Sequence, residues 1–319
     1  MGLMRRLLLA GSESPWLRRH APHLPFIRKA VRRFMPGETL HDALTAAAEL
    51  RQRSISTVLT ELGENVSDAA QADDVTRHYV DALTKIGASG LDCHISVKLT
   101  QLGLDVDRAR CFANLRSLVA CAKEHGTIVW IDMEQHAYVD ATLEIYRRVL
   151  ADFPNVGVCL QAYLYRTAND LTTLIPHGPP SPGFGAAGGV RLVKGAYREP
   201  ASVAYPKKHD VDDNFLALAK LMMGPDLRTA GFRAVFGTHD WRLITAIHDH
   251  MDATGQPRES VEFHLLFGIQ RALQARLARE RYGVRVLVSY GEQWFPWYMR
   301  RLAERPANVL FVAKSMLSR

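Results

Sequence analysis

The sequence has few cysteines, and none of them is spaced as a metal site or redox motif would require. The four are Cys93, Cys111, Cys121 and Cys159, and no two form a CxxC pair. This pattern predicts free thiols in a reducing compartment and no structural metal. Long apolar runs are also absent, since no run approaches the roughly 18 residues needed to cross a bilayer. We therefore expect a protein that is soluble or peripheral to a membrane.

Several catalytic motifs are missing as well. The sequence contains no GxSxG nucleophile elbow, no GxxxxGK[ST] loop and no HExxH motif, which disfavours acyl transfer, P-loop chemistry and zinc peptidase chemistry. Gly183, Gly185 and Gly188 do spell GxGxxG. They precede an expected strand instead of joining a strand to a helix, so they do not predict a dinucleotide site.

One group of residues has the side chains of a metal site but not the expected geometry. Asp132, Glu134 and His136 follow one another along a predicted strand and its loop. Only Asp132 lies within the predicted strand, whereas Glu134 and His136 fall in the loop after it, so the strand and its loop should scatter the three side chains. We therefore expect no metal there.

Positive charge is concentrated near the N-terminus. The formal net charge is +7, and the first 36 residues hold eight Lys or Arg against a single acid, Glu13. This distribution disfavours a nucleic-acid-binding face on the remainder of the chain. Residues 18–34 mix basic and apolar residues at roughly helical spacing, which is typical of a helix packed on the protein body or lying on a membrane surface. The apolar stretch Leu7 to Ala10 is shorter than a secretory signal requires, so we expect a cytoplasmic location, with peripheral contact at the inner face of the cell membrane as an option.

From residue 37 onward, short β-branched or apolar runs alternate with amphipathic helical stretches, as in repeated β/α units. Eight strands are predicted near residues 55–59, 94–99, 127–133, 156–163, 189–197, 233–240, 260–266 and 284–290. Eight units favour a closed (β/α)8 TIM-like barrel over an open doubly wound sheet. We divide the 319 residues into a basic helical extension, 1–40, and a barrel, 41–319, with a further helix over residues 292–304 beside the barrel mouth.

Polar residues stand at the ends of several predicted strands. The period of two places Ser96 and Lys98 on one face of their strand, and it places Arg191, Val193 and Gly195 on one face with Lys194 opposite. By the same alternation, the strand ends expected to face the barrel mouth are Lys98, Asp132, Gln161 and Tyr290. Each alone could be a structural partner. Because barrel enzymes have their active sites at the carboxyl ends of the strands, their convergence predicts a site there.

The motifs SVKLTQLG, IDMEQ, LQAYLYRT, VRLVKGAY, THD and YGEQWFPWYMRRLAE occur in the order found in proline dehydrogenases, over roughly residues 40 to 315. The chain resembles the single-function bacterial type. The resemblance implies oxidation of L-proline to Δ1-pyrroline-5-carboxylate, with hydride transfer from proline C5 to flavin N5 of FAD and electrons passed to a membrane quinone. The alternatives are a related barrel flavoenzyme acting on another cyclic amine or a folate-like substrate, and a barrel that binds amino acids without turnover.

The resemblance also implies roles for individual residues. Lys98, Arg300 and Arg301 would hold the proline carboxylate, and Asp132 would organise the polar pocket; these four form the catalytic set. The proline ring would be walled by Tyr197, Leu266 and Tyr290. The flavin would contact Asp132, Gln161, Arg191, Val193, Lys194, Gly195, Ala196, Thr238 and His239. The natural quinone, the oligomeric state and the acceptor of the amine proton do not follow from these residues.

Two positions depart from the family pattern or complicate it. Trp297 stands where the family usually has a tyrosine against the substrate ring, which leaves tolerance for hydroxyproline open; simple core packing is the other interpretation. Glu64 resembles an acid that pairs with the first arginine of the clamp to close the site, but it could equally be a solvated turn residue. Arg300 and Glu304 are spaced i,i+4, so a surface pair worth about 0.3 to 0.5 kcal/mol is an alternative role for that arginine.

Overall fold

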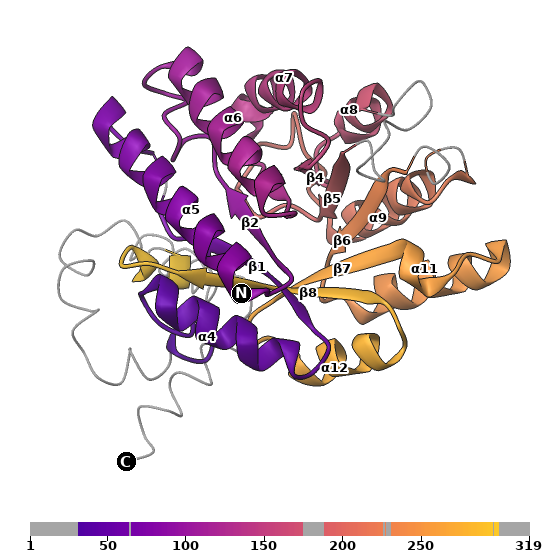
Figure 1. The fold of residues 1–319 in the computed structure, drawn as a ribbon. Helices are drawn as coiled ribbons and strands as arrows, with labels where there is room; N and C mark the ends of the chain where they lie inside the picture. Colours follow the sequence, from indigo (N-terminus) through magenta and orange to yellow (C-terminus); the bar gives the residue numbers. More distant parts are fainter. Residues whose placement is uncertain are drawn as a thin grey trace, which may run out of the picture.

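A closed barrel of eight parallel strands forms the centre of the protein (Figure 1). The computed structural model describes residues 31–63, 65–174, 188–225, 227, 231–295 and 297–299. Each strand pairs with the next along the chain, and β8 returns to pair with β1. The strands are β1 (Ser56–Glu61), β2 (Cys93–Val97), β3 (Val129–Ile131), β4 (Val156–Gln161), β5 (Gly189–Val193), β6 (Arg233–Gly237), β7 (Val261–Leu266) and β8 (Gly283–Tyr290). The predicted barrel and its eight strands are confirmed.

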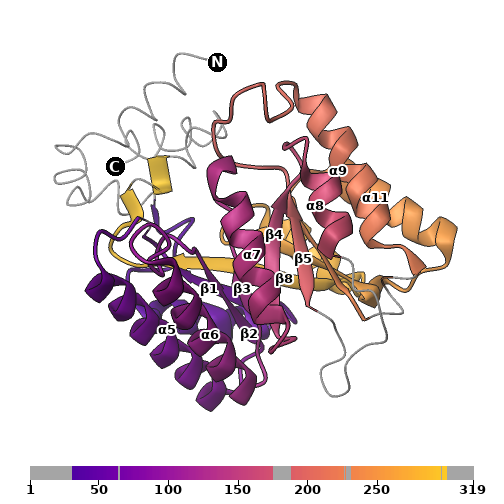
Figure 2. The same cartoon turned by 90° about the horizontal axis from the view of Figure 1, so that it is seen from above.

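Helices surround the strands. They are α4 (Leu40–Arg51), α5 (Ala69–Ser89), α6 (Arg108–Glu124), α7 (Val139–Leu150), α8 (Thr167–Leu174), α9 (Lys208–Met222), α11 (Trp241–Thr254) and α12 (Arg271–Arg279). In Figure 2, α5, α6 and α7 flank one side of the strands and α8, α9 and α11 the other. The N-cap residues Thr39, Asp68, Asp107 and Asp240 each accept a backbone N–H bond of the first turn. These caps explain why four of the helices begin where they do.

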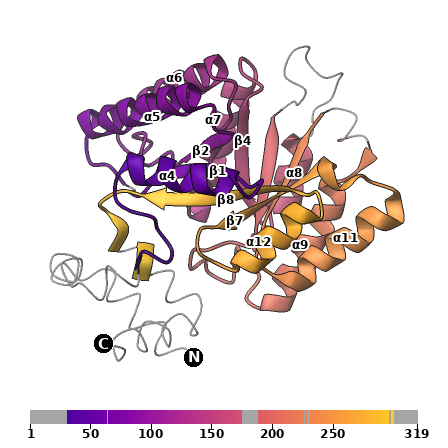
Figure 3. The ribbon, with the colours of Figure 1, turned by 60° about the horizontal axis from the view of Figure 1, so that its bottom comes forward.

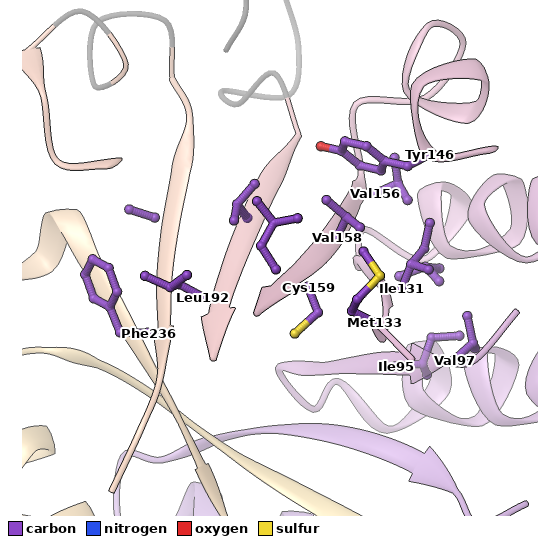
Figure 4. Close-up of a cluster of buried hydrophobic side chains, with 14 of the residues drawn as sticks. Ile95, Val97, Ile131, Met133, Tyr146, Val156, Val158, Cys159, Leu192 and Phe236 are labelled. Carbon is purple, nitrogen blue, oxygen red and sulfur yellow. The ribbon is translucent and has the colours of Figure 1, made fainter. Parts of the chain in front are cut away.

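The main hydrophobic core lies between the strands and the helices. Figure 4 shows Ile131, Val156 and Val158 of neighbouring strands beside Tyr146 of α7. Figure 3 shows α5 and α6 side by side on one flank and α9, α11 and α12 on another. Because the strands are covered by helices outside, the side chains that alternate with these apolar residues point into the barrel.

The inside of the barrel contains a small apolar cluster of its own. Trp130 is completely buried there with Val58 and Val235. The indole fits because Gly157 stands beside it on β4: a Cβ at Gly157 would lie 2.4 Å from Trp130 Cζ3. The Trp130 indole thus fills the barrel beneath the carboxyl ends of the strands.

A second cluster joins the segment after β8 to the segment before α4. Phe34 and Met35 pack against Trp294 and Tyr298, and Trp294 Nε1 donates to Glu38 Oε1 over 2.8 Å. Residues 294, 295 and 297–299 are helical, which agrees with the start of the predicted helix. In the part of the chain that the structure describes, no helix is both long and apolar enough to span a bilayer.

Candidate active site

A cavity of about 770 Å³ opens at the carboxyl ends of the strands. Ligand pockets typically measure 300 to 1,000 Å³, so it can hold an organic ligand of considerable size. The predicted site residues that line it are Lys98, Asp132, Gln161, Arg191, Val193, Lys194, Gly195, Ala196, Tyr197, Thr238, His239, Leu266 and Trp297. Residues far apart in the sequence therefore meet at one place, as predicted.

The floor of this cavity is an ion pair between two strands. Arg191 of β5 is 4% exposed, and its guanidinium pairs with Asp132, directly after β3, and donates to Ser96 Oγ over 3.0 Å. Ser96 Oγ in turn donates to Asp132 Oδ1 over 2.9 Å. Burial opposes the charge of Arg191, but the Asp132 carboxylate and the Cys159 side chain together outweigh burial and raise the pKa of Arg191 above its ordinary value. The floor thus carries a permanent cation in a fixed orientation.

Lys98 brings a second cation to the cavity. It follows β2 directly, and the backbone N–H groups of Gln101 and Leu102 donate to its carbonyl oxygen. Within the described ranges no carboxylate lies within ion-pair distance of its Nζ. A half-buried ammonium that pairs with no carboxylate of the described residues is suited to attract an anionic ligand group.

Gln161 ends β4 with its amide against the cavity. Its Nε2 donates to the carbonyl oxygen of Met133 over 3.4 Å. Its buried Oε1 accepts no hydrogen bond from the described residues. Because a buried acceptor without a donor costs free energy, this oxygen points to a ligand that donates to it.

The chain after β5 passes very close to Tyr163. Gly195 has φ +115°, and a Cβ on it would lie 2.4 Å from Tyr163 Cδ1. Only glycine fits both the conformation and the space. Lys194 pairs with Asp212 of α9 and with Asp240 at the start of α11. Its ammonium therefore fixes the rim of the cavity to two helices.

Thr238 and His239 follow β6 and form the opposite rim. Thr238 Oγ1 accepts the N–H bond of Asp240 over 3.1 Å. The backbone N–H of Leu266 donates to His239 Nε2 over 2.9 Å. This bond joins the ends of β6 and β7 and leaves the proton of a neutral His239 on Nδ1.

Tyr290 is the exception among the strand ends, and its predicted orientation is wrong. It is 1% exposed, points out of the barrel, and its hydroxyl lies 2.8 Å from His78 Nε2 on α5. The inward side chains near the end of β8 are Leu287 and Ser289, and both line the cavity. The alternation of β8 places Tyr290 on the helix-facing side, next to Val288 and Val286.

Other cavity residues escaped the sequence analysis. They include Thr60, Leu62, Met133, Cys159, Lys208, Asp240, Trp241, His264 and Gln270, together with Leu287 and Ser289. For His264, Leu287 and Ser289, counting in steps of two along β7 and β8 was the available signal. The predicted residues Glu64, Arg300 and Arg301, as well as Glu304, lie outside the described residues.

The three residues with metal-ligand side chains after β3 point to different partners, as expected. Asp132 pairs with Arg191, Glu134 accepts from Thr100 Oγ1 over 2.7 Å, and His136 pairs with Glu199. Among the residues with described positions, no three His, Cys, Asp or Glu side chains form a group that could hold a metal ion.

Taken together, the closed β/α barrel and the cavity at its carboxyl ends define a barrel of the enzyme type. Residues 43–314 match the family model described as proline dehydrogenase. The chain belongs to the proline dehydrogenase family.

Two relatives illustrate how close this relationship is. Proline dehydrogenase 1 of Bacillus subtilis (strain 168) is 36% identical over 92% of this chain and 92% of its own length. Proline dehydrogenase of Deinococcus radiodurans is 34% identical over 99% of this chain and 98% of its own length. The match to single-function relatives over nearly their whole length fits the single-function type.

Solved structures show the same barrel. Proline utilization A from Bdellovibrio bacteriovorus superimposes with a TM-score of 0.80 at 22% identity, covering 95% of this chain and 36% of that one. The protein of the same name from Bradyrhizobium japonicum gives a TM-score of 0.72 at 24% identity, covering 94% of this chain and 34% of that one. The present chain spans about a third of the length of these proteins, and at this identity the likeness concerns the fold.

Proposed function

We propose that this protein oxidises L-proline to Δ1-pyrroline-5-carboxylate with FAD as its cofactor and a membrane quinone as the electron acceptor. The observation that carries the proposal is the convergence of the predicted substrate and flavin residues on one cavity. Membership of the proline dehydrogenase family supports it. FAD would accept the hydride from the substrate ring.

The cavity fits a flavin in three respects. Gln161 Oε1 is a buried acceptor that needs a donor from a ligand. Gly195 lets the backbone run along the cavity without a side chain. Arg191 presents a fixed positive charge at the floor, where it would stabilise the electron-rich reduced ring. We assign the remaining flavin contacts to Val193, Lys194, Ala196, Thr238, His239 and Asp132.

The substrate would lie beside Lys98. Its ammonium would bind the proline carboxylate, and Arg300 and Arg301 would complete the clamp by bidentate bonds. Tyr197, Leu266 and Trp297 line the cavity and would form the wall of the ring site, with Leu287 taking the place predicted for Tyr290. Glu64 would close the site by pairing with Arg300. These interactions position the ring C–H bond, which matters more for hydride transfer than a strong acid or base.

A second candidate function is oxidation of a different cyclic amine. The observation that favours it is the presence of Trp297 and Leu287 in the cavity lining. A large indole and a branched aliphatic chain, in place of the two tyrosines that the family pattern predicts, change the volume left for the substrate ring. Because one methylene in an apolar pocket is worth about 1 to 3 kcal/mol, ring size can be discriminated by such contacts.

The test is a visible spectrum of the purified protein under anaerobic conditions, before and after L-proline is added. We expect a flavin spectrum that bleaches with proline. Lys98→Ala should raise the proline concentration for half-bleaching by at least about tenfold, as expected for a lost charged hydrogen bond. Lys220→Ala, on the exposed face of α9, is the matched control and should behave like the wild type.

The other outcomes decide between the candidates. A flavin that ignores proline and bleaches with a cyclic amine of another ring size would favour the second function. A protein that binds no flavin when FAD is supplied would exclude both. Since N-propargylglycine inactivated the Bdellovibrio protein, covalent inactivation by the same compound is a further check, and Lys98→Ala should slow it.

A further inference from the structure

The lower part of the barrel interior is ionic, although such interiors are usually filled by branched apolar side chains. Glu262 and His264 point inward from β7, and Arg285 points inward from β8. Glu262 Oε1 lies 2.6 Å from His264 Nε2, and Glu262 Oε2 accepts from Arg285 Nε over 3.0 Å. Arg285 also binds Asp92, which directly precedes β2 at the end of the barrel away from the cavity. Its Nη2 lies 3.1 Å from Asp92 Oδ2. Ionic side chains therefore run from the base of the barrel up to the cavity.

His264 is the last member of this series and lines the cavity floor. Its Nδ1 lies 3.4 Å from Nη1 of Arg191. The side chain is 3% exposed, and its ring stands edge-on to Trp130 with centroids 5.3 Å apart. The Arg191 guanidinium carbon lies 5.5 Å from the centroid of the same indole. Trp130 thus restricts the position of both groups.

The partners of His264 determine its proton. Burial opposes the charge of Glu262, but Arg285 and His264 outweigh burial and hold the Glu262 pKa well below its usual range. Burial lowers the pKa of His264 to about 4. The charged or titratable groups facing this pair are Arg191, Arg285, Arg233 and His94. A neutral imidazole that donates from Nε2 to a carboxylate has its lone pair on Nδ1, which is the atom that faces Arg191.

We propose that His264, oriented by Glu262, is a positioning residue for Arg191: its Nδ1 accepts a hydrogen bond from the guanidinium and fixes it at the cavity floor. Asp132 and Ser96 hold Nη2 of Arg191, and His264 holds Nη1, so the plane of the guanidinium is defined by partners on β2, on β7 and directly after β3. The orientation of this cation sets how strongly it stabilises negative charge on a ligand above it. That last consequence rests on the proposed flavin function, whereas the orientation itself does not.

The first test reads the tautomer of His264 in the protein as purified. In ¹⁵N–¹H spectra a protonated ring nitrogen and a bare one are readily distinguished, and His264→Gln assigns the signals by their loss. We expect the proton on Nε2 and a bare Nδ1 throughout pH 6 to 8. A proton on Nδ1, or a cationic ring in that range, overturns the proposal whether or not the protein binds flavin.

The second test measures the two-electron midpoint potential of the bound flavin in two variants. His264→Gln retains an acceptor for Arg191 and a donor for Glu262, so its potential should stay close to that of the wild type. His264→Leu has no acceptor, and the equilibrium constant for reduction should fall about tenfold, which is about 30 mV. His41→Leu, on the exposed side of α4, is the matched control.

The outcomes separate this proposal from the proposed function. A potential in His264→Leu equal to that of the wild type, with the flavin still bound, contradicts a positioning role. A wild-type protein that binds no flavin contradicts the proposed function, but the tautomer of His264 still tests whether His264 positions Arg191. If His264→Leu does not fold, the proposal is decided by the tautomer and by whether His264→Gln keeps the wild-type potential.

Discussion

The ammonium of Lys194 lies 2.7 Å from Oδ2 of Asp240 and joins the end of β5 to the N-cap of α11. Asp240 Oδ1 accepts the backbone N–H bond of Arg242 over 3.2 Å in the first turn of that helix. One carboxylate therefore caps a helix with one oxygen and forms ion pairs with Lys194 and Lys208 through the other. Because Lys194, Asp240 and Trp241 all line the cavity, the rim of the site depends on this carboxylate.

Asp240→Ala should lower the free energy of unfolding by about 1 to 2 kcal/mol, since it removes an N-cap and the ion pairs with Lys194 and Lys208. Asp240→Asn keeps an oxygen for the cap and should lose less than half of that amount. Urea unfolding of the two variants gives the comparison. Asp213→Asn, on the exposed side of α9, serves as the control and should change the free energy by less than about 0.5 kcal/mol.

The same carboxylate predicts a dependence on pH. Burial opposes its charge, but the hydrogen bonds and charges of Lys194 and Lys208 together outweigh burial and lower the pKa of Asp240 to about 2. A lowered pKa in the folded state means that the contribution to stability is complete above the ordinary Asp pKa and is lost as pH falls toward 2. The stability difference between the wild type and Asp240→Asn should therefore shrink between about pH 4 and pH 2. A difference that stays constant over this range would contradict the assignment.

Asp132 should matter for folding as well as for the site. Without it, Arg191 keeps its charge in a buried position where its described partners Ser96, His264 and Cys159 carry no full negative charge. Breaking a buried ion pair typically costs 3 to 5 kcal/mol, and because the Asp132 side chain is 22% exposed we expect Asp132→Ala to cost about 3 kcal/mol in urea unfolding. Asp152→Ala, which removes an exposed partner of Arg116, should cost less than about 1 kcal/mol. Equal losses in the two variants would show that the Asp132 pair is solvated in solution.

Substitution of Glu61 by Gln is expected to stabilise the folded protein. Glu61 faces α5, its Oε2 accepts no hydrogen bond from the described residues, and His78 Nε2 lies 3.8 Å away. Burial raises the pKa of Glu61 to about 7. A raised carboxyl pKa means that the folded state loses stability as pH rises from about 4.5 to 7. Glu61→Gln should thus be more stable than the wild type at pH 8, by about 1 to 2 kcal/mol after allowance for its partial exposure.

The advantage of Glu61→Gln should disappear at about pH 3, below the ordinary Glu pKa, where the wild-type carboxyl is protonated in both the folded and the unfolded state. Urea unfolding at the two pH values measures this change. Glu49→Gln, on the exposed face of α4, should show no such dependence. If Glu61→Gln is no more stable than the wild type at pH 8, the carboxyl is better solvated than its position indicates.

The strands and most of the cavity could be predicted because one face of each strand is apolar. In β2, Ile95 and Val97 pack outward, so Lys98 had to face the cavity, and similar counting places Gln161 and Arg191 inside. The predicted inward position of Tyr290 is wrong because Tyr290 has the opposite parity to Arg285 and Leu287, the residues of β8 that point into the barrel.

The ionic interior of the barrel could not be predicted in the same way. Glu262 and His264 alternate with apolar residues along β7, and such a pattern is equally typical of a strand with one solvated face. The role proposed for these residues depends on a contact across the barrel between His264 and Arg191, which are 73 positions apart in the sequence. Alternation assigns a side chain to a face, but it does not identify the partner that the face meets.

Gly195 and Gly90 form a pair that separates conformational strain from lack of space. Both have positive φ, +115° at Gly195 and +61° at Gly90. A Cβ at Gly90 would have no atom within 4 Å, whereas one at Gly195 would lie 2.4 Å from Tyr163 Cδ1. Gly90→Ala should therefore cost about 1 kcal/mol of unfolding free energy, from the left-handed backbone alone. Gly195→Ala should cost about 3 kcal/mol or more, because the chain after β5 or the Tyr163 ring must also move. Only Gly195→Ala should weaken flavin retention as well, measured as the flavin-to-protein absorbance ratio after gel filtration. Equal losses of unfolding free energy in the two variants would mean that the Tyr163 ring can move aside at no measurable cost, and that the close approach at Gly195 does not restrict the residue at this position.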